Sequence, residues 1–128
     1  YTAADYYVLN RIAIQSKKPI YSGRDEAFAS ALIAGATGAV GTSMNFYPQA
    51  FVQIKAAFDR SDIKEAMRLQ TKLNNIIQPM LESGVSLAAM KYVSKLVGVD
   101  CGTGRKPFKE LTKESMIKLE QAVKDNAF

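Results

Sequence analysis

Two short β-prone segments set the strongest limit on how this chain can fold. They are Ile20–Ser22, which Gly23 closes, and the glycine-rich run Gly38–Thr42. A helical pattern with apolar positions at Phe28 and Leu32 separates them, and the connections of about two to six residues suit such units. This rhythm of strand, helix, strand and helix predicts βα units with parallel strands. Parallel strands occur in sheets that are buried on both faces. Two of them alone would also leave unpaired edges, so this pair requires a larger sheet around it.

The length of the chain suits one part of a closed barrel. A barrel of eight βα units takes about 250 residues, whereas this chain has 128 and begins with Tyr1 rather than Met. The sequence therefore predicts an α/β fold, the C-terminal part of a (βα)8 TIM barrel with additional C-terminal helices, taken from a longer chain. We expect residues 1–45 to form the last βα units and residues 46–128 to form the final barrel helix and a helical extension. Both would belong to one domain whose N-terminal part is missing, and we expect the segment not to fold alone.

Helix boundaries are predicted from apolar periodicity and capping residues. The run Thr2–Asp5 has the form of a capping box and predicts a helix over residues 3–15. Gly35 suits the end of the next helix, and Pro48 suits the first position of the one after it. Pro79 is expected to kink or interrupt the long helix that follows. Later caps and ends are predicted at Ser61-Asp62, Gly84, Ser86, Gly98 and Thr112.

The composition excludes several kinds of active site. The chain has no histidine and one cysteine, Cys101. Ser-His-Asp catalysis, Cys-His catalysis, a His/Cys zinc site and a disulfide framework therefore cannot be built within it. No apolar run approaches the roughly 18 to 20 residues of a membrane-spanning helix, so we expect no membrane partner. The net charge of +5 comes from 17 basic and 12 acidic residues that are interspersed, which disfavours a nucleic-acid partner.

Two polar loops follow the predicted strands, where a (βα)8 barrel carries its working residues. The loop Gly23–Glu26 presents the adjacent carboxylates of Asp25 and Glu26, which suit the hydroxyls of a polyhydroxylated ligand. The alternative, which the residues alone favour, is that Asp25 caps the following helix while Glu26 complements its dipole. The loop Thr42–Asn45 offers two hydroxyls and an amide, which suit either a polar substrate or a turn.

These loops resemble those of the N-acetylneuraminate lyase family, whose members are pyruvate-dependent Schiff-base aldolases related to dihydrodipicolinate synthase. The matching runs are Tyr21–Glu26, Phe28–Ala36, Gly38–Ser43, Arg68–Gln70 and Arg105–Phe108. The resemblance covers essentially the whole chain. It implies a cytoplasmic homotetramer that cleaves N-acetylneuraminate reversibly to pyruvate and N-acetylmannosamine, with no metal or organic cofactor. Its expected partners are thus a sugar acid substrate and pyruvate.

The resemblance also implies roles for individual residues. Gly23, Asp25 and Glu26 are expected to bind hydroxyls of the sugar chain, and Thr42 stands where family members commonly have serine. Thr2 matches a threonine that helps to orient the substrate near the imine. The Schiff-base lysine of the family's Gly-x-Lys-x-Thr pattern would immediately precede Tyr1, so no lysine in this chain takes that role.

Two alternative functions stay open. Within the same class, the alternative is another pyruvate-dependent aldolase, such as dihydrodipicolinate synthase or a keto-deoxy sugar acid aldolase. From another class, the alternative is a non-catalytic helical interaction module, whose trailing helices rich in Met and Leu would form an assembly surface.

Overall fold

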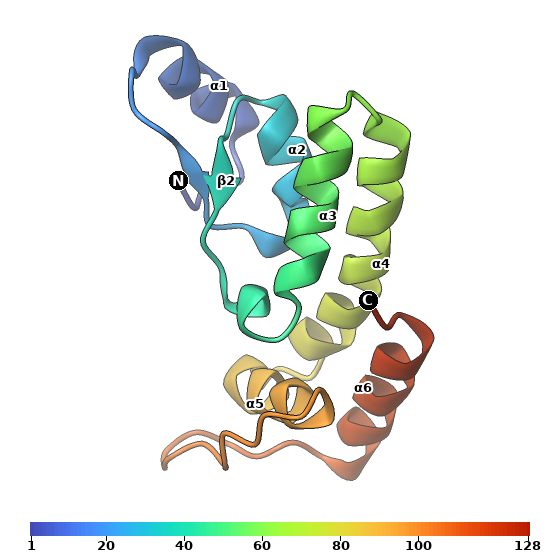
Figure 1. Ribbon diagram of the computed structural model, residues 1–128. Coiled ribbons are helices and arrows are strands. Elements are labelled where there is room, and N and C mark those ends of the chain that lie inside the picture. Colours follow the sequence, from blue (N-terminus) through green and yellow to red (C-terminus); the bar gives the residue numbers. More distant parts are fainter. The chain divides into compact units, whose positions relative to one another are not determined.

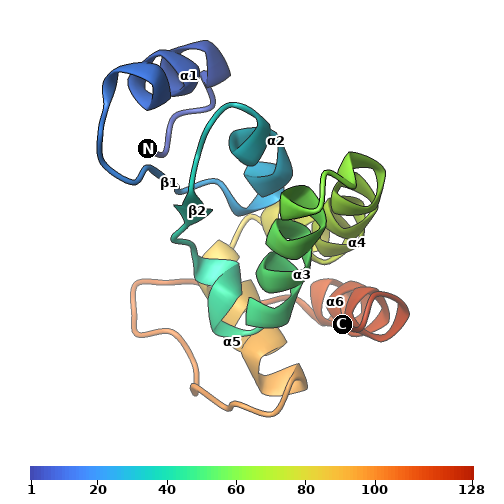
Figure 2. The same cartoon turned by 45° about the horizontal axis from the view of Figure 1, so that its top comes forward.

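The structure, a computed structural model that describes residues 1–128, pairs strands β1 (Tyr21–Ser22) and β2 (Gly38–Ala39) in parallel, as the sequence predicts. Figure 2 shows the two strands side by side. Residue Tyr1 extends the sheet on the opposite side of β1, because its nitrogen donates to the Tyr21 carbonyl at 2.7 Å and its carbonyl accepts from the Gly23 N–H at 2.8 Å. This is the bonding pattern of a parallel pair. Three chain segments therefore leave the sheet at the same edge, the one formed by the carboxyl ends of the parallel strands.

The chain separates into two compact units, residues 1–71 and residues 72–128. Figure 1 labels their helices. The first unit holds both strands and most of the helices, including two short 3-10 helices, η1 and η2. Helix α4 runs across the boundary at residue 71. Helices α5 and α6 belong to the second unit. In chain order the helices are α1 (Tyr6–Gln15), η1 (Asp25–Ala27), α2 (Phe28–Ile33), η2 (Thr42–Asn45), α3 (Pro48–Asp59), α4 (Ile63–Glu82), α5 (Ser86–Leu96) and α6 (Lys113–Asp125).

Helix α1 begins later than the capping box predicts, and Thr2 does not cap it. Its N-cap is Asp5, whose carboxylate accepts a hydrogen bond from the Val8 N–H at 3.0 Å. The prediction was wrong because Tyr1 is bonded into the sheet, which holds Thr2 in the connection before the helix. Helix α1 then buries Leu9 completely.

The packing of α2 on α3 fixes the loops that follow the strands. The rings of Phe28 on α2 and Phe51 on α3 lie 5.5 Å apart between centroids, and both residues are buried together with Leu32 and Ile54. Burial of each such side chain contributes about 1.5–3 kcal/mol. Because η1 leads directly into α2 and η2 leads into α3, this core also fixes the start of each helix.

Several predicted boundaries are confirmed. Gly35 ends α2 with a φ of +106°, and the N–H groups of Gly35 and Ala36 donate to the carbonyls of Leu32 and Ala31 at 3.0 and 2.9 Å. These two bonds form a Schellman motif. Pro48 occupies the first turn of α3, as predicted.

The second predicted strand is shorter and more exposed than expected. Only Gly38 and Ala39 pair with β1, Val40 is 69% exposed, and Thr42 already belongs to η2. Strand β2 has one strand partner, β1. A parallel strand is buried only where neighbours cover both its edges and its faces, so the prediction of a buried strand was wrong for this chain.

The predicted cap Ser61-Asp62 divides between two helices. Ser61 is left-handed, with a φ of +62°, and its N–H donates to the Phe58 carbonyl at 2.8 Å, so it closes α3 rather than opening α4. Asp62 alone caps α4, since its carboxylate accepts from the Glu65 N–H at 3.0 Å. The cap requires an extended backbone, which Ser61 lacks.

In the second unit, α5 and α6 pack on each other and bury Ala89, Val93 and Leu119 completely. Thr112 caps α6 by accepting from the Ser115 N–H at 3.1 Å, as predicted. Ser86 does not cap α5, because it is already the first helical residue and Val85 precedes it without a side-chain cap. Gly84 and Gly98 end α4 and α5 with φ values of +67° and +104°, as predicted. Pro79 lies in the last turn of α4 and does not interrupt it.

Candidate active site

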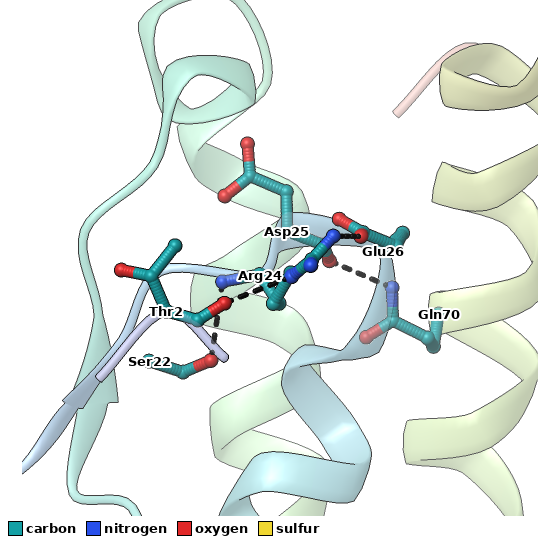
Figure 3. Close-up of polar contacts among 6 residues, drawn as sticks. All are labelled: Thr2, Ser22, Arg24, Asp25, Glu26 and Gln70. Atoms are coloured by element: carbon teal, nitrogen blue, oxygen red, sulfur yellow. Dashed lines mark hydrogen bonds and ion pairs between the residues drawn. The ribbon is translucent and has the colours of Figure 1, made fainter. Parts of the chain in front are cut away.

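The candidate site lies where three chain segments leave the same edge of the sheet. These are Tyr1-Thr2, the loop Gly23–Glu26 after β1, and the loop Gly41–Ser43 after β2. All five predicted site residues lie on these segments: Thr2, Gly23, Asp25, Glu26 and Thr42. Figure 3 shows four of the polar contacts around the loop that follows β1.

Asp25 joins the loop after β1 to the loop after β2. It is 9% exposed, and its Oδ2 accepts a hydrogen bond from the Ser43 N–H at 2.7 Å. Because Ser43 is the second residue of η2, Asp25 satisfies a free N–H at the start of that helix from another loop. The interpretation that Asp25 caps its own helix was wrong, since neither η1 nor α2 has a side-chain cap.

The other carboxylate oxygen of Asp25 has no hydrogen-bond donor. Oδ1 is buried, and it lies against Gly41, where a Cβ atom would sit only 1.5 Å from it. The φ of Gly41 is −158°, an extended value open to any residue, so glycine is needed here for space alone. A buried carboxylate oxygen without a donor is unusual in folded proteins.

Gln70 on α4 fixes the backbone of the loop that carries Asp25. The side chain is 3% exposed; its Nε2 donates to the Asp25 carbonyl at 3.0 Å and its Oε1 accepts from the Ala29 N–H at 2.9 Å. One buried amide therefore fixes both the backbone that carries Asp25 and the start of α2. In the sequence, Gln70 stands out only as part of the family match Arg68–Gln70. The available signal was a polar residue beside Leu69, at a helix position that proves to be buried.

Glu26 lies at the more open side of the loop, where Arg24 connects it to the N-terminal segment. The Arg24 Nη1 atom donates to Glu26 Oε1 at 3.1 Å, and its Nε donates to the Thr2 carbonyl at 2.9 Å. The two side chains of this ion pair are 44% and 38% exposed. Figure 3 shows the guanidinium group between Thr2 and Glu26. Burial raises the pKa of the Tyr6 phenol, and the charge of Glu26 adds to this shift while that of Arg24 opposes it.

Thr2 and Thr42 are the two predicted site residues that carry hydroxyl groups. The Thr2 hydroxyl covers Gly23, where a Cβ atom would sit 2.5 Å from Oγ1. Thr42 is exposed and directly precedes Ser43, and its carbonyl accepts from the Asn45 side-chain amide at 2.9 Å. The structure thus brings Thr2 to Gly23 and Asp25 to the Gly41–Ser43 loop, while the roles of these residues toward a ligand stay predictions.

Other features of the chain lie apart from this site. A cavity of about 310 Å³ in the second unit is lined by residues such as Tyr92 and Lys95, and a cavity of about 410 Å³ in the first unit lies beside Phe51 and Lys55. Neither is lined by a predicted site residue. No group of three His, Cys, Asp or Glu side chains is placed to hold a metal ion. None of the helices has both the length and the apolar character needed to cross a membrane.

Comparison with known proteins gives consistent matches over nearly the whole chain. The Dihydrodipicolinate synthetase family matches residues 2–126. Two curated relatives, the N-acetylneuraminate lyases of Clostridium perfringens and Rhizobium meliloti, are 34% and 32% identical over 122 and 124 residues, which are 94% and 96% of this chain. The crystal structure of N-acetylneuraminate lyase from Fusobacterium nucleatum complexed with pyruvate matches with a TM-score of 0.89 and 31% identity, over 99% of this chain.

The chain spans about two fifths of these proteins: 42% and 41% of the two relatives and 43% of the solved structure. The match confirms the predicted fold class, an α/β fold that corresponds to the C-terminal portion of a TIM barrel with additional helices. It also explains why a two-stranded parallel sheet occurs here, since the strands that would cover it belong to the rest of such a barrel.

Proposed function

The chain belongs to the dihydrodipicolinate synthetase family, and on this premise we propose that the whole protein is a class I, Schiff-base aldolase that uses pyruvate. Its proposed reaction is the reversible cleavage of N-acetylneuraminate to pyruvate and N-acetylmannosamine. The observation that carries the choice of substrate is the pair of adjacent carboxylates at the sheet edge, in a chain that is 34% identical to a N-acetylneuraminate lyase. The family resemblance implies a cytoplasmic homotetramer, which is part of this proposal.

The carboxylate pair suits the polyhydroxylated tail of such a sugar acid. An ionised carboxylate accepts hydrogen bonds and donates none, whereas each sugar hydroxyl can donate one. Glu26 is half-exposed and can accept such a bond, and Asp25 lies beside it in the loop with its Oδ1 buried against Gly41. Gly23 would contribute through its backbone, because the Thr2 hydroxyl occupies the space that a side chain would need.

The reacting end of the substrate would lie toward Thr2. The resemblance places the Schiff-base lysine immediately before Tyr1, and Tyr1 pairs in parallel with β1, so that lysine would lie beside β1, just before the Gly23 loop begins. Its amine would form an imine with the keto carbon, releasing water, and the imine would accept the electron pair of the carbon–carbon bond that breaks. Thr2 would orient the substrate next to this imine, and Thr42 would offer a hydroxyl from the loop after β2.

Borohydride trapping followed by cleavage kinetics tests the proposal on the intact protein. With pyruvate and borohydride, we expect a covalent mass increase at one lysine. Glu26→Ala should lower kcat/KM for N-acetylneuraminate by about 10- to 150-fold, the size of one lost hydrogen bond to a charged group, without lowering the trapped fraction. Glu65→Ala is the matched control, because Glu65 also pairs with an arginine, at 2.7 Å, but lies in the first turn of α4, outside the loops that carry the predicted site residues.

The alternatives predict different outcomes. A protein that traps pyruvate but does not cleave N-acetylneuraminate would be another pyruvate-dependent aldolase, such as dihydrodipicolinate synthase or a keto-deoxy sugar acid aldolase. A protein that traps no pyruvate would contradict the enzyme proposal and favour the helical interaction module.

A further inference from the structure

We propose that Arg24 is a positioning residue that holds the Glu26 carboxylate toward the substrate and ties it to the segment carrying Thr2. This inference rests on the proposed function, because it concerns how the carboxylate is presented to the sugar chain. Arg24 lies between Gly23 and the two carboxylates of its loop, and the family resemblance implies no role for it.

The contacts of Arg24 join two chain segments that are otherwise separate in sequence. Its Nε donates to the Thr2 carbonyl at 2.9 Å, and its Nη1 donates to Glu26 Oε1 at 3.1 Å. Its backbone N–H donates to the Ser22 hydroxyl at 3.3 Å, which fixes the start of the side chain near β1. Because the guanidinium group is planar and rigid, the bond to Thr2 sets the direction of the bond to Glu26. A flexible lysine could not hold both partners in this way.

The exposure of Glu26 explains what the hydrogen bond from Arg24 contributes. A glutamate side chain that is 38% exposed can occupy several rotamers, and it binds a hydroxyl well only in one of them. A half-exposed ion pair contributes little to stability, so the benefit of Arg24 is orientation.

The test measures KM and kcat separately for the intact protein with N-acetylneuraminate. Arg24→Met, which keeps the length of the side chain, should raise KM about tenfold and change kcat less than about threefold, because Glu26 is no longer held in the rotamer that binds the hydroxyl. Arg24→Lys should give an intermediate KM. Arg68→Met is the matched control: Arg68 binds Glu65 with two bonds of 2.7 Å on α4, and its loss should leave KM unchanged.

Two further measurements separate positioning from a general structural role. In a Glu26→Ala background, Arg24→Met should add no further rise in KM. With a shortened 2-keto-3-deoxy acid that lacks the terminal hydroxyls, Arg24→Met and wild type should have equal KM values. A rise in KM that persists in either case would overturn the proposal, as would a wild-type KM in the simple Arg24→Met variant.

The outcomes also distinguish this proposal from the proposed function. If wild-type protein does not trap pyruvate or does not cleave N-acetylneuraminate, the function fails and the role of Arg24 fails with it. If wild type cleaves and Arg24→Met matches it, only the role of Arg24 fails. If Arg24→Met does not fold, the comparison of Arg24→Lys with wild type decides, and equal KM values would overturn the proposal.

Discussion

Replacing Gly41 by alanine tests whether the Asp25 carboxylate depends on the space beside residue 41. A Cβ atom there would lie 1.5 Å from Asp25 Oδ1 and 2.4 Å from its Cγ, which no small shift can relieve. The backbone presents no obstacle, since a φ of −158° is open to alanine. The Asp25 side chain must therefore turn away and lose its 2.7 Å hydrogen bond from the Ser43 N–H.

The size of the effect follows from that lost bond. A hydrogen bond to a charged group contributes about 1.5–3 kcal/mol, while Gly→Ala at an unstrained position gains about 0.4–1 kcal/mol through the unfolded state. We therefore expect Gly41→Ala to lower the free energy of unfolding by about 1–2 kcal/mol. If Asp25 binds a substrate hydroxyl, kcat/KM should also fall by about 10- to 150-fold.

Urea unfolding of the intact protein and the rate of pyruvate release measure the two effects. In an Asp25→Ala background, Gly41→Ala should be neutral or slightly stabilising, because the three nearest atoms in conflict all belong to the carboxylate. Gly84→Ala is the control: its φ of +67° predicts a loss of about 1 kcal/mol, with cleavage unchanged. Equal losses from Gly41→Ala with and without the Asp25 carboxylate would refute this reasoning.

Three other predictions follow from the same structure. Gln70→Leu leaves the Asp25 carbonyl and the Ala29 N–H buried without their partner, so it should lower the free energy of unfolding by about 2–4 kcal/mol, which urea unfolding measures. Asp62→Ala removes the N-cap of α4 and should lower thermal stability by about 1 kcal/mol, with KM for N-acetylneuraminate unchanged. The hydrogen bond with Glu120 raises the pKa of Tyr92 above its ordinary value of 10.0, so this bond stabilises the fold at neutral pH and its contribution is lost as the pH rises through the raised pKa. In Glu120→Gln, ¹³C NMR of labelled tyrosine should show this pKa closer to its ordinary value, and an unchanged pKa would contradict the assignment.

Features that depend on neighbouring residues could be predicted from the sequence. The spacing of two β-prone runs around a helix predicted a parallel pair, because a helix between two strands carries the chain back so that the second strand runs in the same direction as the first. The predicted helix ends at Gly35, Pro48 and Thr112 are correct. The backbone N–H and C=O groups that decide a helix end lie within a few residues of it, so the local sequence is enough to predict it. The identity of the loop residues also carried the family resemblance, and hence the candidate site.

The contacts that organise the site were decided by the tertiary structure. Thr2 has the sequence of a helix cap, yet the pairing of Tyr1 with β1 keeps it out of the helix. Asp25 stands at a position that suits the cap of its own helix, but it binds Ser43, and Gln70 reaches its backbone from α4. These partners lie 18 and 45 residues from Asp25. A carboxylate bonds to whichever N–H the packed chain brings within reach, and only the packing of α2, α3 and α4 determines which one that is.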